Sequence, residues 1–212
     1  MQHSVTRRGF LQRGLAGVTA VAPLFISRSA LAQGDRPGAN DRVGVAIIGC
    51  GRRGVSYFNA AVPRVQVVAT CDVHLTRAQQ TAQQMGCRDF FQDYRRVLDR
   101  KDVAAVMIST PDDWHALIAI AACQAGKHVY VEKPMTMCVV EGRRMVEAAR
   151  KYKRIVQVGS QQRSTVPNRD GCAFIRNGGI GKVTRVIGPN LASPWICDFP
   201  GQPVPAELDW ES

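Results

Sequence analysis

The feature that most constrains the fold is a regular alternation of apolar runs and helical segments between residues 42 and 159. Runs rich in valine, isoleucine and alanine predict five strands, at residues 43–49, 65–72, 103–109, 128–133 and 155–159. Helical patterns lie at residues 53–62, 75–85, 93–99, 114–125 and 140–152. Strands this apolar are buried on both faces, as in a parallel sheet with helices on each side. The sequence therefore predicts an α/β fold of the Rossmann type, a doubly wound parallel sheet.

The composition is that of a globular chain, with 45% hydrophobic and 21% charged residues. A formal net charge of +11 is compatible with nucleic acid as a partner, but no helix-turn-helix, zinc-finger or base-stacking pattern accompanies the scattered basic residues. The seven cysteines contain no C-x-x-C pair, and several lie in apolar runs where a thiol packs as a small hydrophobe. We therefore expect no nucleic-acid partner, no bound metal and no disulfide framework.

The N-terminal segment has the pattern of an export signal. Residues 6–12, TRRGFLQ, place paired arginines before an aromatic–leucine pair, and the apolar run of twelve residues that follows is too short to cross a bilayer. Ala30 and Ala32 occupy the small-residue positions of a cleavage site. Residues 1–32 resemble a bacterial twin-arginine signal, which implies the twin-arginine export machinery as a partner and a periplasmic location. We expect residues 33–41 to form a flexible lead-in.

A glycine-rich turn follows the first predicted strand. Gly49 permits the tight turn, Gly51 lets the backbone approach a pyrophosphate, and Gly54 allows the helix to pack closely on the strand. Asp72 ends the second strand eighteen residues after Gly54, where a carboxylate can accept hydrogen bonds from an adenosine ribose. This arrangement predicts a dinucleotide site.

The cofactor predicted by Asp72 is NAD, since its negative charge repels a 2′-phosphate. Arg52 and Arg53 leave NADP open, because a nearby arginine can accommodate that phosphate. The two arginines are equally consistent with a pyrophosphate contact and with plain solvent-exposed charges.

Two further strand ends bring polar residues to the same edge of the sheet. Thr110 and Pro111 end one strand, and His115 follows in the first turn of the next helix, where it either faces the crevice or has a structural role. The strand at residues 128–133 ends in Glu132-Lys133-Pro134, either as a charged strand end or as a placed lysine. Proline restricts the residue before it, so Lys133 would be held at the edge where open α/β sheets bind ligands. Whether the Lys133–Pro134 bond is cis stays open.

A lysine in that position has a chemical use. Hydride transfer from a carbinol requires its hydroxyl to lose a proton. The ammonium group of Lys133 could orient that hydroxyl, stabilise developing negative charge, or act as a base after burial lowers its pKa.

Taken together, IIGCGRRG, the acidic Asp72, STPDDWH, and VEKPMT followed by EGRRMVEAARKYKRIVQVGSQQR resemble the Gfo/Idh/MocA oxidoreductases over roughly residues 42 to 190. The export signal points to the exported, sugar-active branch of that family. The resemblance implies that Lys133 is the catalytic lysine, that Glu132 lies beside it between cofactor and substrate, and that Gln161 and Arg163 border an interdomain cleft. With Arg53 added from the glycine turn, the candidate cofactor-binding residues are Gly49, Gly51, Arg53, Gly54, Asp72, Thr110, Pro111, His115, Glu132, Lys133 and Gln161.

The domain boundaries follow from the same pattern. Residues 42–162 form the NAD(P)-binding domain, and residues 163–212 are expected to be only the beginning of a C-terminally truncated α+β substrate domain. A helix is expected at residues 169–176, and the alternation at residues 181–193 predicts a strand exposed on one face. In the family this domain often carries the oligomer contact, so a homo-oligomer is expected only when the domain is complete.

The function expected is an NAD(P)-dependent oxidoreductase that transfers hydride between a nicotinamide cofactor and a sugar, polyol or related cyclic alcohol. Two alternatives stay open. One is an NAD-dependent glycosidase of the same fold, and the other is a truncated, non-catalytic fragment that binds nucleotide.

Overall fold

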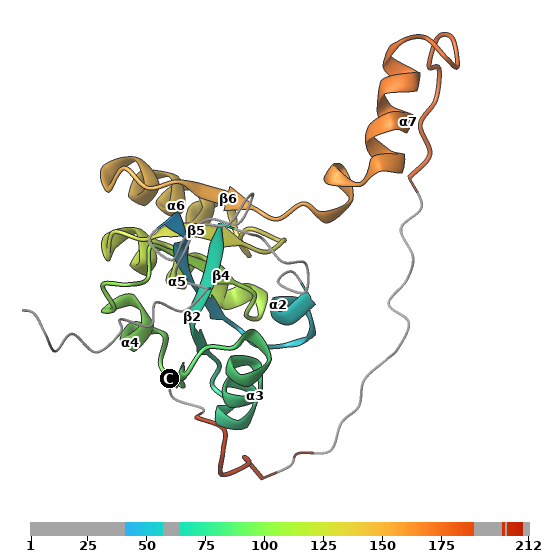
Figure 1. Cartoon of the computed structure of the whole chain (residues 1–212). Helices are drawn as coiled ribbons and strands as arrows, with labels where there is room; N and C mark the ends of the chain where they lie inside the picture. The colour runs from blue at the N-terminus through green and yellow to red at the C-terminus, as the bar shows by residue number, and fades with distance from the viewer. Residues whose placement is uncertain (1–40, 57–63, 189–200, 202, 210–212) are drawn as a thin grey trace, which may run out of the picture. The chain divides into compact units, whose positions relative to one another are not determined.

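The computed structural model describes residues 41–56, 64–188, 201 and 203–209. The described residues contain a six-stranded sheet in the order β3-β2-β1-β4-β5-β6, and every adjacent pair of strands is parallel (Figure 1). The strands are β1 (Val43–Ile48), β2 (Val65–Cys71), β3 (Asp89–Phe91), β4 (Ala105–Ile108), β5 (His128–Val131) and β6 (Val156–Val158). The strand order reverses at β1, and open α/β sheets bind ligands at such a switch point, beyond the carboxyl ends of the strands.

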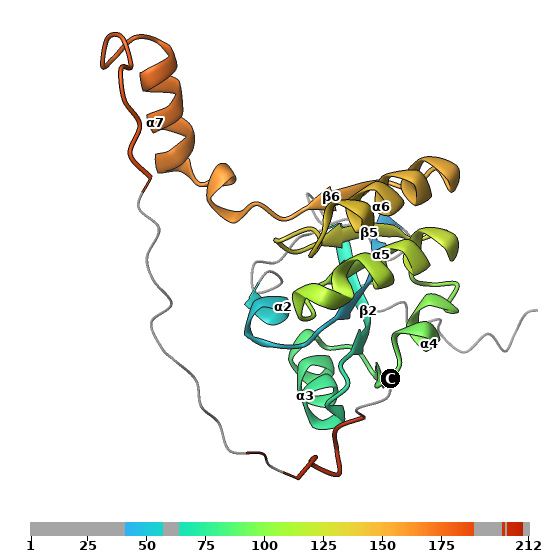
Figure 2. The same cartoon turned by 180° about the vertical axis from the view of Figure 1, so that it is seen from behind.

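The helices up to Lys151 lie in two layers, one on each face of the sheet, whereas the last helix has no buried residue. Their bounds are α2 (Arg52–Ser56), α3 (Leu75–Met85), α4 (Tyr94–Leu98), α5 (His115–Gln124), α6 (Val139–Lys151) and α7 (Val166–Arg176), with 3-10 turns η2 (Asp112–Trp114) and η3 (Gln161–Ser164). Helices α4, α5 and α6 cover one face, with α5 and α6 side by side (Figures 1 and 2). On the other face, Gly54 of α2 packs near Ile47, and Thr70 of β2 donates to the Ala78 carbonyl of α3 (2.9 Å).

Alternation along the strands explains the two layers. In β1, Ala46 and Ile48 belong to the core under α4–α6, whereas Ile47 faces α2, and all three side chains are at most 2% exposed. Burial on both faces is why the strands are almost continuously apolar, and the α/β prediction is confirmed.

Besides shifts of one or two residues at several element ends, three larger differences from expectation occur. Strand β3 was missing from the prediction, because three residues are too few to show a period. Helix α7 begins at Val166, three residues before its expected start, with proline in its first turn. Residues 182–188 form no strand; they are exposed, and β structure requires a pairing partner that these residues lack in the described part of the chain.

Some predictions concern residues that the structure does not describe. The export signal at residues 1–32 lies outside the described residues, as do residues 33–40 of the lead-in and the end of the first predicted helix. Among the residues described, no helix combines the length and apolarity needed to cross a bilayer.

Candidate functional site

Backbone hydrogen bonds between adjacent strand ends build the carboxyl edge of the sheet, and four of them run from β2 to β6. Gly49 N–H donates to Cys71 O (2.8 Å), Ser109 to Ile48 (2.8 Å), Glu132 to Ile108 (3.0 Å) and Gly159 to Val131 (2.7 Å). These bonds place three segments along one rim of the sheet. They are the glycine turn (residues 49–54), the Thr110 turn (residues 109–111) and the Lys133 turn (residues 132–134). The expectation that these three segments share an edge is therefore met by the fold.

The three glycines of the turn each meet a different steric environment. Gly49 has φ +91°, and a Cβ there would lie 2.5–2.6 Å from the backbone of Ser109 and Thr110. A Cβ on Gly54 would overlap the Gly49 carbonyl oxygen, whereas one on Gly51 would meet nothing within 4 Å. Gly49 and Gly54 thus permit the turn and the close helix contact, and Gly51 leaves its backbone open to a ligand.

Asp72 is 7% exposed and fixes the glycine turn to the end of β2. Its Oδ2 accepts from the backbone N–H of Cys50 (2.8 Å), and its Oδ1 accepts from the backbone N–H of His74 (2.9 Å). The Arg77 guanidinium lies 3.4 Å from Oδ1. A carboxylate has room for further bonds beyond these, so Asp72 can still accept from a ribose hydroxyl.

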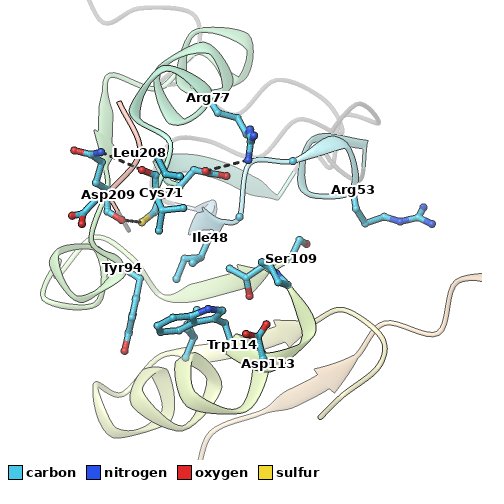
Figure 3. A pocket seen from close by; sticks show the side chains of 18 of the residues that line it. Ile48, Arg53, Cys71, Arg77, Tyr94, Ser109, Asp113, Trp114, Leu208 and Asp209 are labelled. Carbon is cyan, nitrogen blue, oxygen red and sulfur yellow. Dashed lines mark hydrogen bonds and ion pairs between the residues drawn. The ribbon is translucent and has the colours of Figure 1, made fainter. Parts of the chain in front are cut away.

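A cavity of about 730 Å³ opens between these elements (Figure 3), a size typical of sites for small ligands and cofactors. It is lined by Ile48, Gly49, Gly51, Arg52, Arg53, Cys71, Asp72, Val73, Arg77, Gln92, Tyr94, Ser109, Thr110, Pro111, Asp113, Trp114, Ile118, Leu208 and Asp209. Two of the lining groups, Ser109 Oγ and Thr110 Oγ1, are buried and have no hydrogen-bond partner among the described residues. Buried hydroxyls without a partner are uncommon, and a polar ligand that reached them from the cavity would complete their hydrogen bonds.

His115 does not line this cavity. It is 1% exposed, its Nδ1 lies 2.7 Å from the carbonyl oxygen of Pro134, and its Nε2 lies 3.0 Å from that of Thr110. Both ring nitrogens are engaged by backbone, so neither is available to a cofactor. These contacts favour the structural role that the sequence left open, in which His115 ties the Thr110 turn to the Lys133 turn.

Lys133 is exposed at the end of β5, and its peptide bond to Pro134 is cis. Glu132 beside it is only 3% exposed, and its Oε1 accepts from Tyr130 Oη (3.2 Å). Neither residue lines the cavity, which lies toward β1, β2 and β4. Lys133 therefore lies on the same rim as the cavity, on its β5 side.

Arg53 and Gln161 come together from opposite ends of the domain. With its side-chain amide turned so that the oxygen faces the arginine, Gln161 accepts from Arg53 Nη1 at 2.9 Å. The guanidinium of Arg53 accordingly points away from the other labelled residues of the cavity (Figure 3). Arg53 thus links the glycine turn to η3, and only part of it borders the cavity.

The two buried thiols at this site, Cys50 in the glycine turn and Cys71 at the end of β2, are unreactive. Burial, with the charge of Asp72 as the next cause, raises the pKa of the Cys50 thiol to about 12, and burial also raises the pKa of Cys71. Protonated thiols are poor nucleophiles, so these cysteines pack the site and do not react in it.

Sequence reasoning missed Arg77, Trp114, Leu208 and Asp209 among the lining residues. Arg77 follows Asp72 by five residues in the first turn of the next helix, and Trp114 precedes His115, so both were within reach of the motif argument. Leu208 and Asp209 had no local signal.

Comparison with known proteins places this site in a family. Residues 43–160 match the family model GFO_IDH_MocA, described as an oxidoreductase family with an NAD-binding Rossmann fold. Inositol 2-dehydrogenase of Salmonella typhimurium is 35% identical over 159 residues, which cover 72% of this chain and 47% of that protein. A glycosyl hydrolase family 109 protein of Shewanella baltica is 31% identical over 176 residues, covering 72% and 38%.

Among solved structures, myo-inositol 2-dehydrogenase from Lactobacillus plantarum superposes with a TM-score of 0.63 at 26% identity, covering 67% of this chain and 43% of that one. The chain thus spans about half the length, or less, of the relatives that it matches. The family match extends over more than half of the chain and includes the glycine turn, Asp72 and the Lys133 turn. The chain therefore belongs to the Gfo/Idh/MocA family of oxidoreductases.

Proposed function

We propose that the complete protein is an NAD(P)-dependent oxidoreductase that moves a hydride between a nicotinamide cofactor and a carbinol carbon of a sugar, polyol or related cyclic alcohol. The observation that carries the proposal is the shared rim. The open Gly51 backbone, the Asp72 carboxylate and the Lys133 ammonium all lie at the carboxyl edge of one parallel sheet.

The cavity fits a dinucleotide in its donor and acceptor groups. The pyrophosphate would lie on the Gly49–Gly54 turn, and the adenosine ribose would bond to Asp72. The nicotinamide end would face Ser109 Oγ and Thr110 Oγ1, the two hydroxyls that lack partners. When bound, the cofactor supplies the hydride chemistry, and these residues hold it in place.

NAD is the cofactor that the charges favour. Asp72 is buried, negative and held by two backbone N–H groups, so it cannot turn away from a 2′-phosphate. Arg77 lies close enough to compensate part of that charge, and NADP therefore stays a weaker second choice.

Lys133 is the residue proposed to act on the substrate. As hydride leaves the carbinol carbon, its hydroxyl must lose a proton, and a nearby ammonium or amine can stabilise the oxygen or take that proton. Buried Glu132, His115 and the backbone bond from Glu132 to Ile108 hold the turn that carries it. Lys133 itself needs no contact with the cofactor cavity to serve this role.

The relatives suggest the substrate class. Two of those compared are named as inositol 2-dehydrogenases, which makes a cyclic polyol the first substrate to test. We further propose that residues 1–32 direct the folded protein to the periplasm through the twin-arginine machinery, with cofactor bound before export. A completed α+β domain would then form the substrate wall and a homo-oligomer contact.

The experiment is a substrate screen on protein expressed from the complete reading frame. Purified protein is incubated with NAD or NADP and a panel of inositols, sugars and glycosides, and NADH formation is followed together with leaving-group release. NADH formation from a cyclic polyol or sugar supports the proposal. Release of a glycoside leaving group without net NADH would instead establish the glycosidase alternative, and no turnover on any panel member would leave only nucleotide binding.

A further inference from the structure

A segment far along the chain pairs with the rim of the cavity. The tail segment, residues 205–209, runs antiparallel to residues 73–75, which follow β2. An isolated β-bridge joins His74 and Leu208, and backbone hydrogen bonds of 3.1 and 2.9 Å flank it on either side. The tail segment is therefore attached by main-chain bonds, which do not depend on its side chains.

A side chain reinforces this attachment. The Nε2 of Gln92, just after β3, lies 3.1 Å from the carbonyl oxygen of Val73 and 3.2 Å from that of Glu207. One amide group thus bridges the turn after β2 and the tail segment. Gln92 and Glu207 are 115 residues apart in sequence, so this contact belongs to the tertiary fold.

The tail segment contributes two residues to the cavity, Leu208 and Asp209 (Figure 3). They lie at the end of the cavity that Asp72, Val73 and Arg77 also line, away from the Thr110 turn. In the proposed function this is the adenosine end. Both Leu208 and Asp209 are only partly exposed.

We propose that the tail segment is the outer wall of the adenosine subsite and a determinant of cofactor choice. Leu208 supplies an apolar surface against the adenine, and Asp209 adds a second carboxylate beside Asp72 where a 2′-phosphate would lie. The proposal rests on the proposed cofactor site and adds residues that the glycine motif does not contain.

The charge balance at this end explains why the second carboxylate matters. Arg77 is the cation nearest to Asp72, at 3.4 Å, and one guanidinium beside one carboxylate leaves little net charge. Arg52, Arg53 and Asp113 also line the cavity, but at the end lined by Asp72, Asp209 and Arg77 the three groups sum to one negative charge, and the second carboxylate opposes a doubly charged phosphate there.

The test is calorimetric titration of the 212-residue chain with NAD, NADP, AMP and nicotinamide mononucleotide. Leu208→Ala should lower the affinity for NAD and for AMP about tenfold, which is the usual effect of a lost apolar contact in a pocket. Its affinity for nicotinamide mononucleotide should not change. Asp209→Asn should raise the affinity for NADP relative to NAD about fivefold. Thermal melts of each variant confirm that the domain is still folded.

Glu207→Gln is the matched control. It removes the same charge two residues away, on a side chain that is half exposed and does not line the cavity, and it keeps the backbone carbonyl that holds the tail segment. The ratio of its affinity for NADP to its affinity for NAD should equal that of the unmodified chain. If Glu207→Gln changed this affinity ratio as much as Asp209→Asn does, the assigned role of Asp209 would be overturned.

The two hypotheses fail in different ways. If the unmodified chain binds neither NAD nor AMP, the proposed cofactor site is wrong. If it binds both, and Leu208→Ala and Asp209→Asn bind all four ligands as it does, only the tail inference is wrong. The tail inference would also be overturned if Leu208→Ala lost as much affinity for nicotinamide mononucleotide as for AMP. The effect of the substitution would then not be confined to the adenosine end of the cavity.

Discussion

The sheet region, residues 43–159, and the following segment, residues 160–188, differ in how their apolar residues are covered. In the sheet region Ile47, Ile108 and Val131 are fully buried, and the strand ends are joined by main-chain bonds across the whole rim. Helix α7 has no buried residue, and its Phe174 and Ile175 are 58% and 44% exposed. One region sets its own geometry, and the other needs a surface to pack against.

This difference teaches which properties belong to which region. The cavity is lined almost wholly by the sheet region, with Leu208 and Asp209 of the tail segment as the exceptions. The substrate side has no such enclosure among the described residues. Cofactor binding can therefore be tested on this chain, whereas turnover has to be tested on the complete protein.

The largest expected effect separates the two properties at one residue. Lys133→Ala in the complete protein should lower kcat by about 10²–10⁴-fold, because a positioned acid–base group contributes that much. Its dissociation constant for NAD should not change, since Lys133 does not line the cavity. Steady-state kinetics and NAD titration measure the two, with Lys133→Arg as a control that keeps the charge but not the geometry. Unchanged turnover would remove Lys133 from the mechanism.

A pair of glycine variants tests the contrast in packing. Gly54→Ala places a methyl group on the Gly49 carbonyl and should cost about 2 kcal/mol of stability or more, with at least a tenfold loss of NAD affinity. Gly171→Ala in α7 meets nothing within 4 Å and should be neutral or slightly stabilising, since alanine favours a helix. Denaturant unfolding measures both. Equal destabilisation would mean that the two regions are not packed differently.

Asp72 gives a smaller effect, confined to the cofactor. Asp72→Asn keeps the shape of the side chain but removes its charge. The affinity for NAD should therefore fall about tenfold, and the preference for NAD over NADP should become smaller. Titration with both cofactors measures the change. A preference that survives intact would place the source of discrimination elsewhere, for example at Asp209.

A further effect concerns pH and is confined to alkaline conditions. The pKa of Cys50 is raised from 9.0 to about 12 in the folded protein, so the unfolded chain releases this proton at lower pH than the folded chain does. The free energy of unfolding should therefore fall as the pH rises from about 9 toward 12. Cys50→Ala should make that slope shallower without reversing it. Denaturant melts across that range measure the slopes, and identical slopes would show that Cys50 is not the group responsible.

The parts of the fold that sequence predicts are those with local causes. Five strands follow from apolar runs, because burial on both faces leaves few polar positions in them. The Gly49–Gly54 turn and Asp72 follow from the needs of a dinucleotide at a strand end. The placement of Glu132 and Lys133 on the shared rim follows from parallel pairing alone.

The parts that sequence could not predict depend on distant partners. His115 carries no sign of which carbonyl groups it will meet, and its role as a tie between two turns exists only after β4 and β5 have paired. The Gln161–Arg53 contact and the tail segment join residues more than a hundred positions apart. The strand expected at residues 181–193 shows the reverse error over residues 181–188, the part of it that the structure describes, because alternation indicates an exposed face but does not provide a neighbouring strand.

Gly159 has a consequence for how this chain can vary. Any side chain there would collide with Tyr130 Oη and Glu132 Oε1, so the end of β6 is shaped by atoms of the neighbouring strand. Saturation mutagenesis at this position should favour glycine, and Tyr130→Phe alone should not make alanine acceptable, because Glu132 Oε1 and the ring Cζ of residue 130 would still lie 2.5 and 2.9 Å from its Cβ. The residues that hold the Lys133 turn thus restrict evolution at a position that carries no chemical group of its own.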